Sequence, residues 1–113
     1  LIAGLTSAFS LSLAFVQGNG VSPDQFLDIL RKSALYAPTF DKKRRRMLER
    51  DFSAPNFPAK HLAKDITLFI ETARSLNLDT AGLEGLQEIM EKVIHQGRGE
   101  QDYSVIHDII YPR

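Results

Sequence analysis

The sequence has no cysteine and no net charge. Among its 113 residues, fourteen Lys and Arg balance fourteen Asp and Glu. The lack of cysteine excludes a disulfide scaffold, a thiol nucleophile and a cysteine-ligated zinc or iron–sulfur site. It is also compatible with the cytoplasmic location that we predict. The balanced charge argues against a protein that binds nucleic acid mainly by electrostatic attraction, because such proteins carry an excess of positive charge.

The sequence also lacks a hydrophobic run of membrane-spanning length. Residues 1–16 include eleven Ala, Val, Ile, Leu or Phe, but Gly, Ser and Thr interrupt them. A transmembrane helix needs about 20 apolar residues, and no positive segment precedes the run as it would in a signal peptide. We expect a helix that is apolar on most sides and buried at the centre of a helical protein. Because the chain starts within this helix and without an initiator Met, we expect it to be part of a longer protein.

Common catalytic and metal-binding motifs are missing. His61, His95 and His107 are far apart and match no metal-ligand spacing such as H-E-x-x-H, so we interpret them as solvated or boundary histidines. There is no G-x-S-x-G elbow and no G-x-G-x-x-G after a strand. Glu88 and Glu91 are expected to face solvent. We therefore predict no metal site, and the residues alone offer few candidates for a catalytic role.

Apolar residues recur with a period of 3.6 along most of the chain, and no segment alternates with a period of two. The pattern predicts an all-α fold: a single domain of about six helices arranged around the first one. We expect helices over about 1–17, from 22 onward, over 40–50, 59–76 and 80–96, and after Asp102, which can cap the last helix.

Several helix ends are marked by turn-forming and capping residues. Gly18-Asn19-Gly20 is typical of a left-handed helix end. Ser22 is expected to cap the second helix, with Pro23 at its first position and Gln25 completing a capping box. We expect Pro38 to end that region. The predicted buried stripe of the second helix consists of Phe26, Leu27, Leu30 and Ala34.

The run Lys42-Lys43-Arg44-Arg45-Arg46 has two interpretations. It could bind phosphate or nucleic acid, or it could be a solvated helix face that pairs with acidic residues elsewhere. We favour the second interpretation, because the rest of the chain is not basic and no aromatic residues interleave with the run.

Lys60 and Lys64 lie one turn apart, in the first two turns of the helix after Pro58. The helix dipole is positive there, so two cations are mildly unfavourable for the helix alone, and a bound anion would reverse this. The alternative is that both lysines are simply exposed. The residues alone favour that alternative.

Several motifs, in this order, resemble the C-terminal helical domain of the β-hydroxyacid dehydrogenases, relatives of 6-phosphogluconate dehydrogenase. They are Gly20-Val21-Ser22-Pro23 after an apolar helix, the segment 46–52 that reads Arg-Met-Leu-Glu-Arg-Asp-Phe, Pro55-Asn56-Phe57, Leu62-Ala63-Lys64-Asp65, and Asp102-Tyr103-Ser104. The resemblance covers essentially the whole chain, residues 1–113. One departure is Leu11, where many members have Glu, and it leaves the subfamily and the substrate open.

The resemblance implies a two-domain parent enzyme that transfers hydride between NAD or NADP and a small 3-hydroxy acid or its semialdehyde. An N-terminal Rossmann domain would bind most of the cofactor, and the catalytic Lys and its Asn would lie upstream of Leu1. The isolated chain would then be inactive.

The resemblance also implies roles for three residues of this chain. Lys64 matches a lysine that reaches the cofactor near the nicotinamide. Phe57 and Asp65 are expected at the substrate pocket, and Asp65 could instead orient Lys64 or cap the chain locally. From the residues alone, Phe57 could equally be a hydrophobic staple. The first helix would contribute to a subunit interface, so we expect a homo-oligomer. One alternative function is a small helical binding module that uses segment 42–46 for an acidic partner or nucleic acid. Another is a purely structural helical domain without a ligand.

Overall fold

The computed structural model describes residues 1–113 and contains only helices and connecting loops. Its only extended pairing is an isolated bridge between Pro58 and Asp102. The all-α expectation is therefore confirmed. No helix has both the length and the apolar character needed to cross a membrane. The elements in chain order are α1 (Ile2–Gly18), α2 (Pro23–Arg31), α3 (Pro38–Glu49), α4 (Ala59–Ser75), α5 (Ala81–His95), the short 3-10 helix η1 (Tyr103–Val105) and α6 (Ile106–Ile110).

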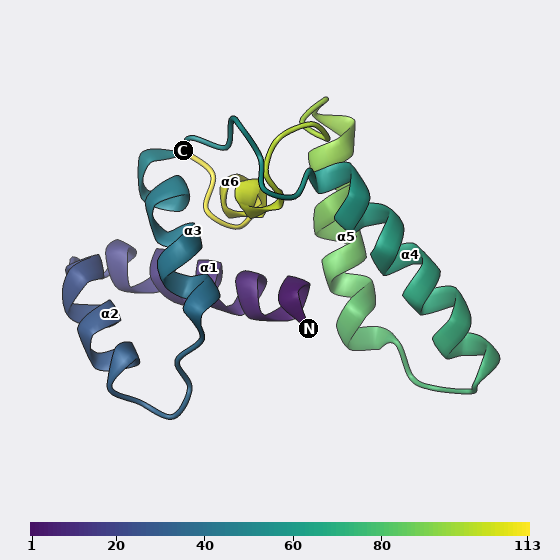
Figure 1. Cartoon of the computed structure of the whole chain (residues 1–113), viewed down its shortest axis with the longest axis horizontal. Coiled ribbons are helices and arrows are strands. Elements are labelled where there is room, and N and C mark those ends of the chain that lie inside the picture. The colour runs from purple at the N-terminus through teal and green to yellow at the C-terminus, as the bar shows by residue number, and fades with distance from the viewer.

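Helix α1 joins the two ends of the molecule (Figure 1). Helices α2 and α3 pack at one end, α4 and α5 lie side by side at the other, and α6 lies between them against α1. Each end has its own apolar cluster, and α1 contributes to both. Ala3 belongs to the cluster built mainly from α4, α5, η1 and α6, whereas Phe9 and Leu13 join Leu27, Phe40 and Met47.

Burial of α1 is confined to one side, against which α2, α3, α5 and α6 pack. Phe9 and Leu13 are buried, but the side chains of Leu11 and Phe15 are 61% and 70% exposed. The apolar residues on the second side of α1 therefore have no partner within these 113 residues.

The first helix ends as its sequence predicts. The Gly20 N–H donates to the Gln17 carbonyl at 3.0 Å and the Val21 N–H to the Val16 carbonyl at 2.9 Å, a Schellman pair. Gly20 has φ +73°, a conformation in which a side chain would be strained.

Three expectations around α2 need correction. Ser22 does cap the helix, but its hydroxyl accepts from the Asp24 N–H rather than forming a capping box with Gln25. The helix ends at Arg31, so Ala34 lies outside it and is exposed. Of the predicted stripe only Leu27 is fully buried, while Phe26 and Leu30 are half-buried.

Pro38 begins α3 and does not end the preceding region. Proline fits the first position of a helix, because its missing N–H would have no partner there. α3 therefore starts two residues earlier than the sequence pattern indicated.

A buried ion pair connects α3 to the segment before α6. The Lys43 ammonium lies 3.0 and 2.9 Å from the two Asp102 carboxylate oxygens, and both side chains are almost completely shielded from solvent. The same carboxylate accepts the Asn56 N–H at 3.1 Å and both the N–H and the hydroxyl of Ser104. Burial raises the pKa of Asp102, but hydrogen bonds from Ser104 and Lys43 outweigh this effect, so its pKa lies below the ordinary value. The carboxyl group is therefore ionised at neutral pH.

His107 is buried, which corrects the interpretation of all three histidines as solvated or boundary residues. His61 and His95 are exposed, but His107 is 1% exposed, and its Nδ1 lies 2.8 Å from the hydroxyl of Ser10 on α1. Burial, followed by the nearby Arg50 charge, lowers the pKa of His107 to about 4. The imidazole is therefore neutral at physiological pH and helps to hold α6 against α1.

The first prediction concerns acid stability. Because the pKa of His107 falls from 6.5 to about 4 on folding, protonation favours the unfolded chain between these values. We expect this residue alone to remove up to about 3 kcal/mol of unfolding free energy as the pH drops from 6.5 to 4. The unfolding free energy, measured by urea denaturation across this range, should depend less steeply on pH in His107→Gln than in wild type. An equally shallow profile in the exposed-site control His61→Gln would contradict this account.

The second prediction concerns the buried ion pair. Asp102→Asn leaves the Lys43 charge without a carboxylate in a dry site, and we expect it to lower the unfolding free energy by about 3–5 kcal/mol. The matched control is Arg45→Gln, which breaks the exposed Arg45–Glu49 pair of the same helix and should cost less than about 1 kcal/mol. Denaturant midpoints measure both, and equal losses would show that the buried pair does not stabilise the fold.

Candidate functional site

An apolar cavity lies between the start of α1 and the paired helices α4 and α5. Its volume is about 390 Å³, and Asp65 is the only charged residue in its wall. Phe57 and Asp65, the two residues predicted from the sequence for a substrate pocket, both line it. The remaining lining residues, which the sequence did not suggest, are Leu1, Ile2, Ala3, Leu62, Ile66, Phe69 and Leu83.

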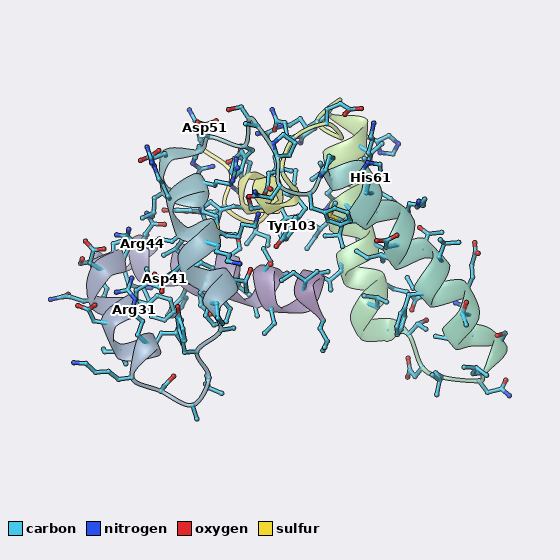
Figure 2. All side chains as sticks on the ribbon, in the orientation of Figure 1. Arg31, Asp41, Arg44, Asp51, His61 and Tyr103 are labelled. Carbon is cyan, nitrogen blue, oxygen red and sulfur yellow. The ribbon has the colours of Figure 1, made fainter.

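Phe57 is held in place by the loop that follows α3. Its carbonyl accepts the Tyr103 N–H at 3.0 Å, and the preceding residue, Asn56, donates its N–H to the buried Asp102. The Phe57 ring packs edge-on against Tyr103 and stacks on His61, with ring centroids 6.1 and 5.9 Å apart. Figure 2 shows His61 and Tyr103 beside this loop. The buried ion pair thus fixes one wall of the apolar cavity.

In the first turn of α4, two backbone N–H groups and the Lys60 charge already have partners within the chain. The Ala59 N–H donates to the Gln101 carbonyl at 2.8 Å and the Lys60 N–H to the Gly99 carbonyl at 2.9 Å. The Lys60 ammonium pairs with the carboxylate of Glu100. An anion bound jointly by Lys60 and Lys64 is therefore not needed to balance this helix end.

Lys64 remains a free cation. It is exposed and forms no ion pair or hydrogen bond within the chain, and it is not part of the cavity wall that its neighbour Asp65 lines. Its ammonium is thus available to a group outside these 113 residues. The cofactor role of Lys64 stays a prediction.

The basic run of α3 is largely paired, as we favoured from the sequence. Lys43 binds Asp102, Arg44 pairs with Asp24, and Arg45 pairs with Glu49 at 3.0 Å. Arg46 donates to the carbonyls of residues 53 and 54. Only Lys42 of the five has no such partner. The side chains of the run therefore form ion pairs and hydrogen bonds within α3 and with other segments, and they do not form an open basic surface.

No group of three or more His, Asp or Glu side chains converges in a way that could hold a metal ion. Glu88 and Glu91 are both exposed, as expected, and Glu88 lies 3.3 Å from Lys92 one turn later. Within this chain, the apolar cavity with Phe57 and Asp65 is therefore the strongest candidate for a functional site.

The chain is similar to reductases and dehydrogenases that are much longer than it is. It is 27% identical over 110 residues to glyoxylate/succinic semialdehyde reductase 1 of Arabidopsis thaliana, which covers 97% of this chain and 38% of the relative. The chloroplastic reductase 2 of the same plant is 22% identical over 106 residues, covering 94% and 29%. The chain thus spans well under half the length of these curated relatives.

A solved structure confirms the fold. The crystal structure of a 3-hydroxyisobutyrate dehydrogenase from Salmonella typhimurium superimposes with a TM-score of 0.82 at 20% identity, covering 96% of this chain and 38% of that one.

The chain also matches a protein-family model. Residues 1–110 match the family model described as NAD-binding of NADP-dependent 3-hydroxyisobutyrate dehydrogenase. The match spans nearly the whole chain and agrees with the helical fold. The expectation of NAD or NADP as the cofactor of the parent protein is confirmed at the level of this family. The chain belongs to the family of NAD-binding domains of NADP-dependent 3-hydroxyisobutyrate dehydrogenases.

Proposed function

We propose that this chain is the C-terminal helical domain of an NAD(P)-dependent β-hydroxyacid dehydrogenase and forms the substrate-side wall of its active site. The observation that carries the proposal is the convergence of Phe57 and Asp65 on one cavity. They come from a loop and from α4, and Leu1 together with the first two residues of α1 lines the same cavity. The general acid/base lysine that the family resemblance implies upstream of Leu1 would act on a substrate held in this cavity.

In this proposal, each cavity residue has a distinct task. The Phe57 ring, fixed by Tyr103 and His61, covers the carbon skeleton of a small acid and excludes water from it. The Asp65 carboxylate accepts a hydrogen bond from a hydroxyl of the substrate and fixes its orientation. The nicotinamide would supply the hydride acceptor or donor, and Lys64 would hold the cofactor beside the cavity. The unpaired state of Lys64 fits that task, since no carboxylate of the chain competes for its ammonium.

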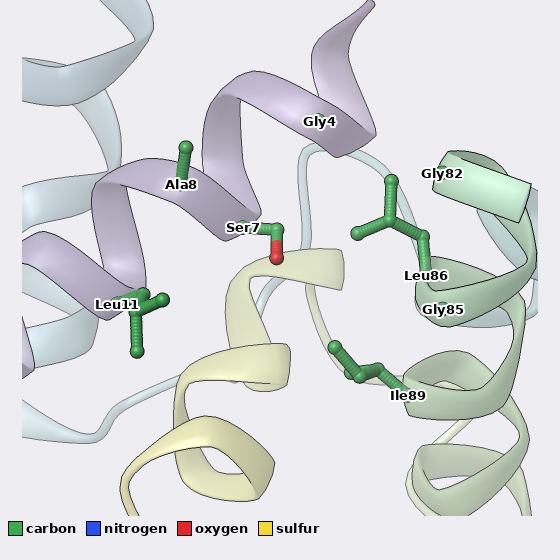
Figure 3. A pocket seen from close by; sticks show the side chains of 8 residues that line it. All are labelled: Gly4, Ser7, Ala8, Leu11, Gly82, Gly85, Leu86 and Ile89. Atoms are coloured by element: carbon green, nitrogen blue, oxygen red, sulfur yellow. The ribbon is translucent and has the colours of Figure 1, made fainter.

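We further propose that the exposed side of α1 forms a subunit interface. An open groove of about 400 Å³ separates α1 from α5, and four of its lining residues are Gly or Ala. Figure 3 shows Ser7 and Leu11 of α1 on one side of this α1–α5 groove, facing Leu86 and Ile89 of α5. Small residues let another helix approach closely, and the exposed Leu11 and Phe15 supply apolar area that association would bury.

The binding-module alternative has less support. A module that used segment 42–46 for an acidic partner would need free cations, but four of those five side chains bind groups within the chain. Only Lys42 would be available without breaking an existing interaction.

The third prediction tests the dehydrogenase proposal in the longer protein that contains this chain. NAD(P)H absorbance would be followed with a panel of small 3-hydroxy acids and semialdehydes. We expect turnover by the longer protein and none by the 113-residue chain. Lys64→Ala should lower kcat/KM by about 10- to 100-fold, the value of a hydrogen bond to a charged group. Phe57→Ala should mainly raise KM.

Lys32→Ala is the matched control, because Lys32 is also an exposed lysine without a partner. It should leave kcat/KM unchanged. No turnover with any acid or cofactor would refute the enzyme proposal, and an equal loss in both lysine variants would refute the role of Lys64.

The fourth prediction tests the proposed interface. The 113-residue chain should self-associate at micromolar concentration, as measured by light scattering. Leu11→Lys places a charge beside the α1–α5 groove and should shift the chain to monomer. Ile29→Lys is the matched control, since Ile29 on α2 is 72% exposed and lies away from the groove. A monomeric wild-type chain would contradict the proposal.

A further inference from the structure

The pair Asn19-Gly20 at the end of α1 places a side-chain amide next to an unshielded backbone nitrogen. Asparagine is a thermolabile residue, because the backbone nitrogen of the following residue can attack its Cγ and displace the amide. A Cβ on the following residue hinders this attack, but glycine has none, and no other atom fills the space beside Gly20 where a Cβ would stand. Asn19 is also exposed, so water reaches the reacting groups. The pair therefore has the chemistry and the access that spontaneous deamidation needs.

The other two asparagines of the chain lack this combination. Asn56 is followed by Phe57 and Asn77 by Leu78, and both following residues carry bulky side chains. Asn77 matches Asn19 in other respects, because it is exposed and lies just beyond the end of α4. The N–H of Leu78 donates to a carbonyl of that helix at 3.0 Å, as the N–H after Asn19 does in α1. The two sites thus differ mainly in the residue that follows the asparagine.

In the folded chain, both reacting groups at the end of α1 are engaged in hydrogen bonds. The Gly20 N–H, whose nitrogen would attack, donates to the Gln17 carbonyl at 3.0 Å, and Nδ2 of Asn19 donates to the Phe15 carbonyl at 2.8 Å. The reaction removes both donors and rotates the backbone of Asn19 away from its ψ of 11°. Helix ends open locally far more often than a whole domain unfolds. The reaction therefore requires fraying of the last turn of α1.

We propose that Asn19 is a site of spontaneous deamidation whose rate is controlled by the end of α1. The Gly20 nitrogen gives its proton to hydroxide and bonds to Cγ of Asn19. The bond from Cγ to Nδ2 then breaks, and the amide leaves as ammonia with a proton from water. Water opens the resulting five-membered succinimide at either carbonyl, which leaves aspartate or isoaspartate at position 19 and adds one negative charge. The inference does not depend on the proposed dehydrogenase function.

Neither product rebuilds the end of α1. Isoaspartate lengthens the backbone by one methylene between positions 19 and 20, which disrupts the paired hydrogen bonds of the Gly20 and Val21 N–H groups. Aspartate keeps the backbone but lacks the amide that donates to the Phe15 carbonyl, and its charge lies at the negative end of the helix dipole. Deamidation is thus a one-way step that loosens the last turn of α1.

The test follows all three asparagines of the 113-residue chain by peptide mass spectrometry during incubation in mildly alkaline buffer made with oxygen-18 water. We expect label at position 19, in both aspartate and isoaspartate, and none at Asn77 over the same period. Unfolding the chain in guanidinium chloride should speed the reaction at Asn19 at least about tenfold, because the helix end no longer holds the Gly20 nitrogen. The purified modified chain should melt at a lower temperature than the unmodified one.

Gly20→Ala in guanidinium chloride separates the chemistry from the fold, because the unfolded chain has no helix end. The added Cβ should slow the reaction at Asn19 toward the rate at Asn77. Label at Asn77 as fast as at Asn19, or no label at Asn19 even in the unfolded chain, would overturn the assignment of the site. Equal rates at Asn19 in the folded and unfolded chains would overturn its control by the end of α1.

Discussion

The ion pair between Lys43 and Asp102 is the interaction on which the arrangement of this domain depends. Two opposite charges are placed in a dry site, where leaving either of them alone would be costly. The Asp102 carboxylate also accepts hydrogen bonds from Asn56 and Ser104. One side chain therefore fixes helix α3, the loop after it and the start of the last helical segment. These elements bring Phe57 to the apolar cavity and pack Tyr103 against its ring.

A second polar contact, between α1 and α6, also fixes the arrangement of the helices. The Ser10–His107 hydrogen bond joins α6 to the middle of α1, while α1 itself contributes to the apolar clusters at both ends. The same helix lines the apolar cavity with its first residues and leaves Leu11 and Phe15 exposed farther along. A single helix thus links the candidate site to the proposed interface.

The periodicity of the sequence predicted the helices, and the family resemblance pointed to Phe57 and Asp65, but neither indicated the polar contacts that position them. Periodicity and end signals such as Gly20 depend on neighbours along the chain, so α1, α4 and α5 were found within a few residues. Pro38 was misinterpreted because proline can end one helix or begin the next. Lys43 lies on the same face of α3 as Phe40 and Met47, which could have indicated its burial. Its partner Asp102 is 59 residues away, and no local pattern reveals such a pair. His107 was missed for the same reason, since Ser10 is 97 residues away.

The most direct measurement of the central claim is a crystal structure of the longer protein with NAD(P) and a small hydroxy acid bound. The account predicts that the acid occupies the apolar cavity, with its carbon skeleton against Phe57 and a hydroxyl within hydrogen-bond distance of the Asp65 carboxylate. The Lys64 ammonium should then contact the cofactor. An acid bound away from Phe57 and Asp65, with Lys64 still free in solvent, would contradict the account.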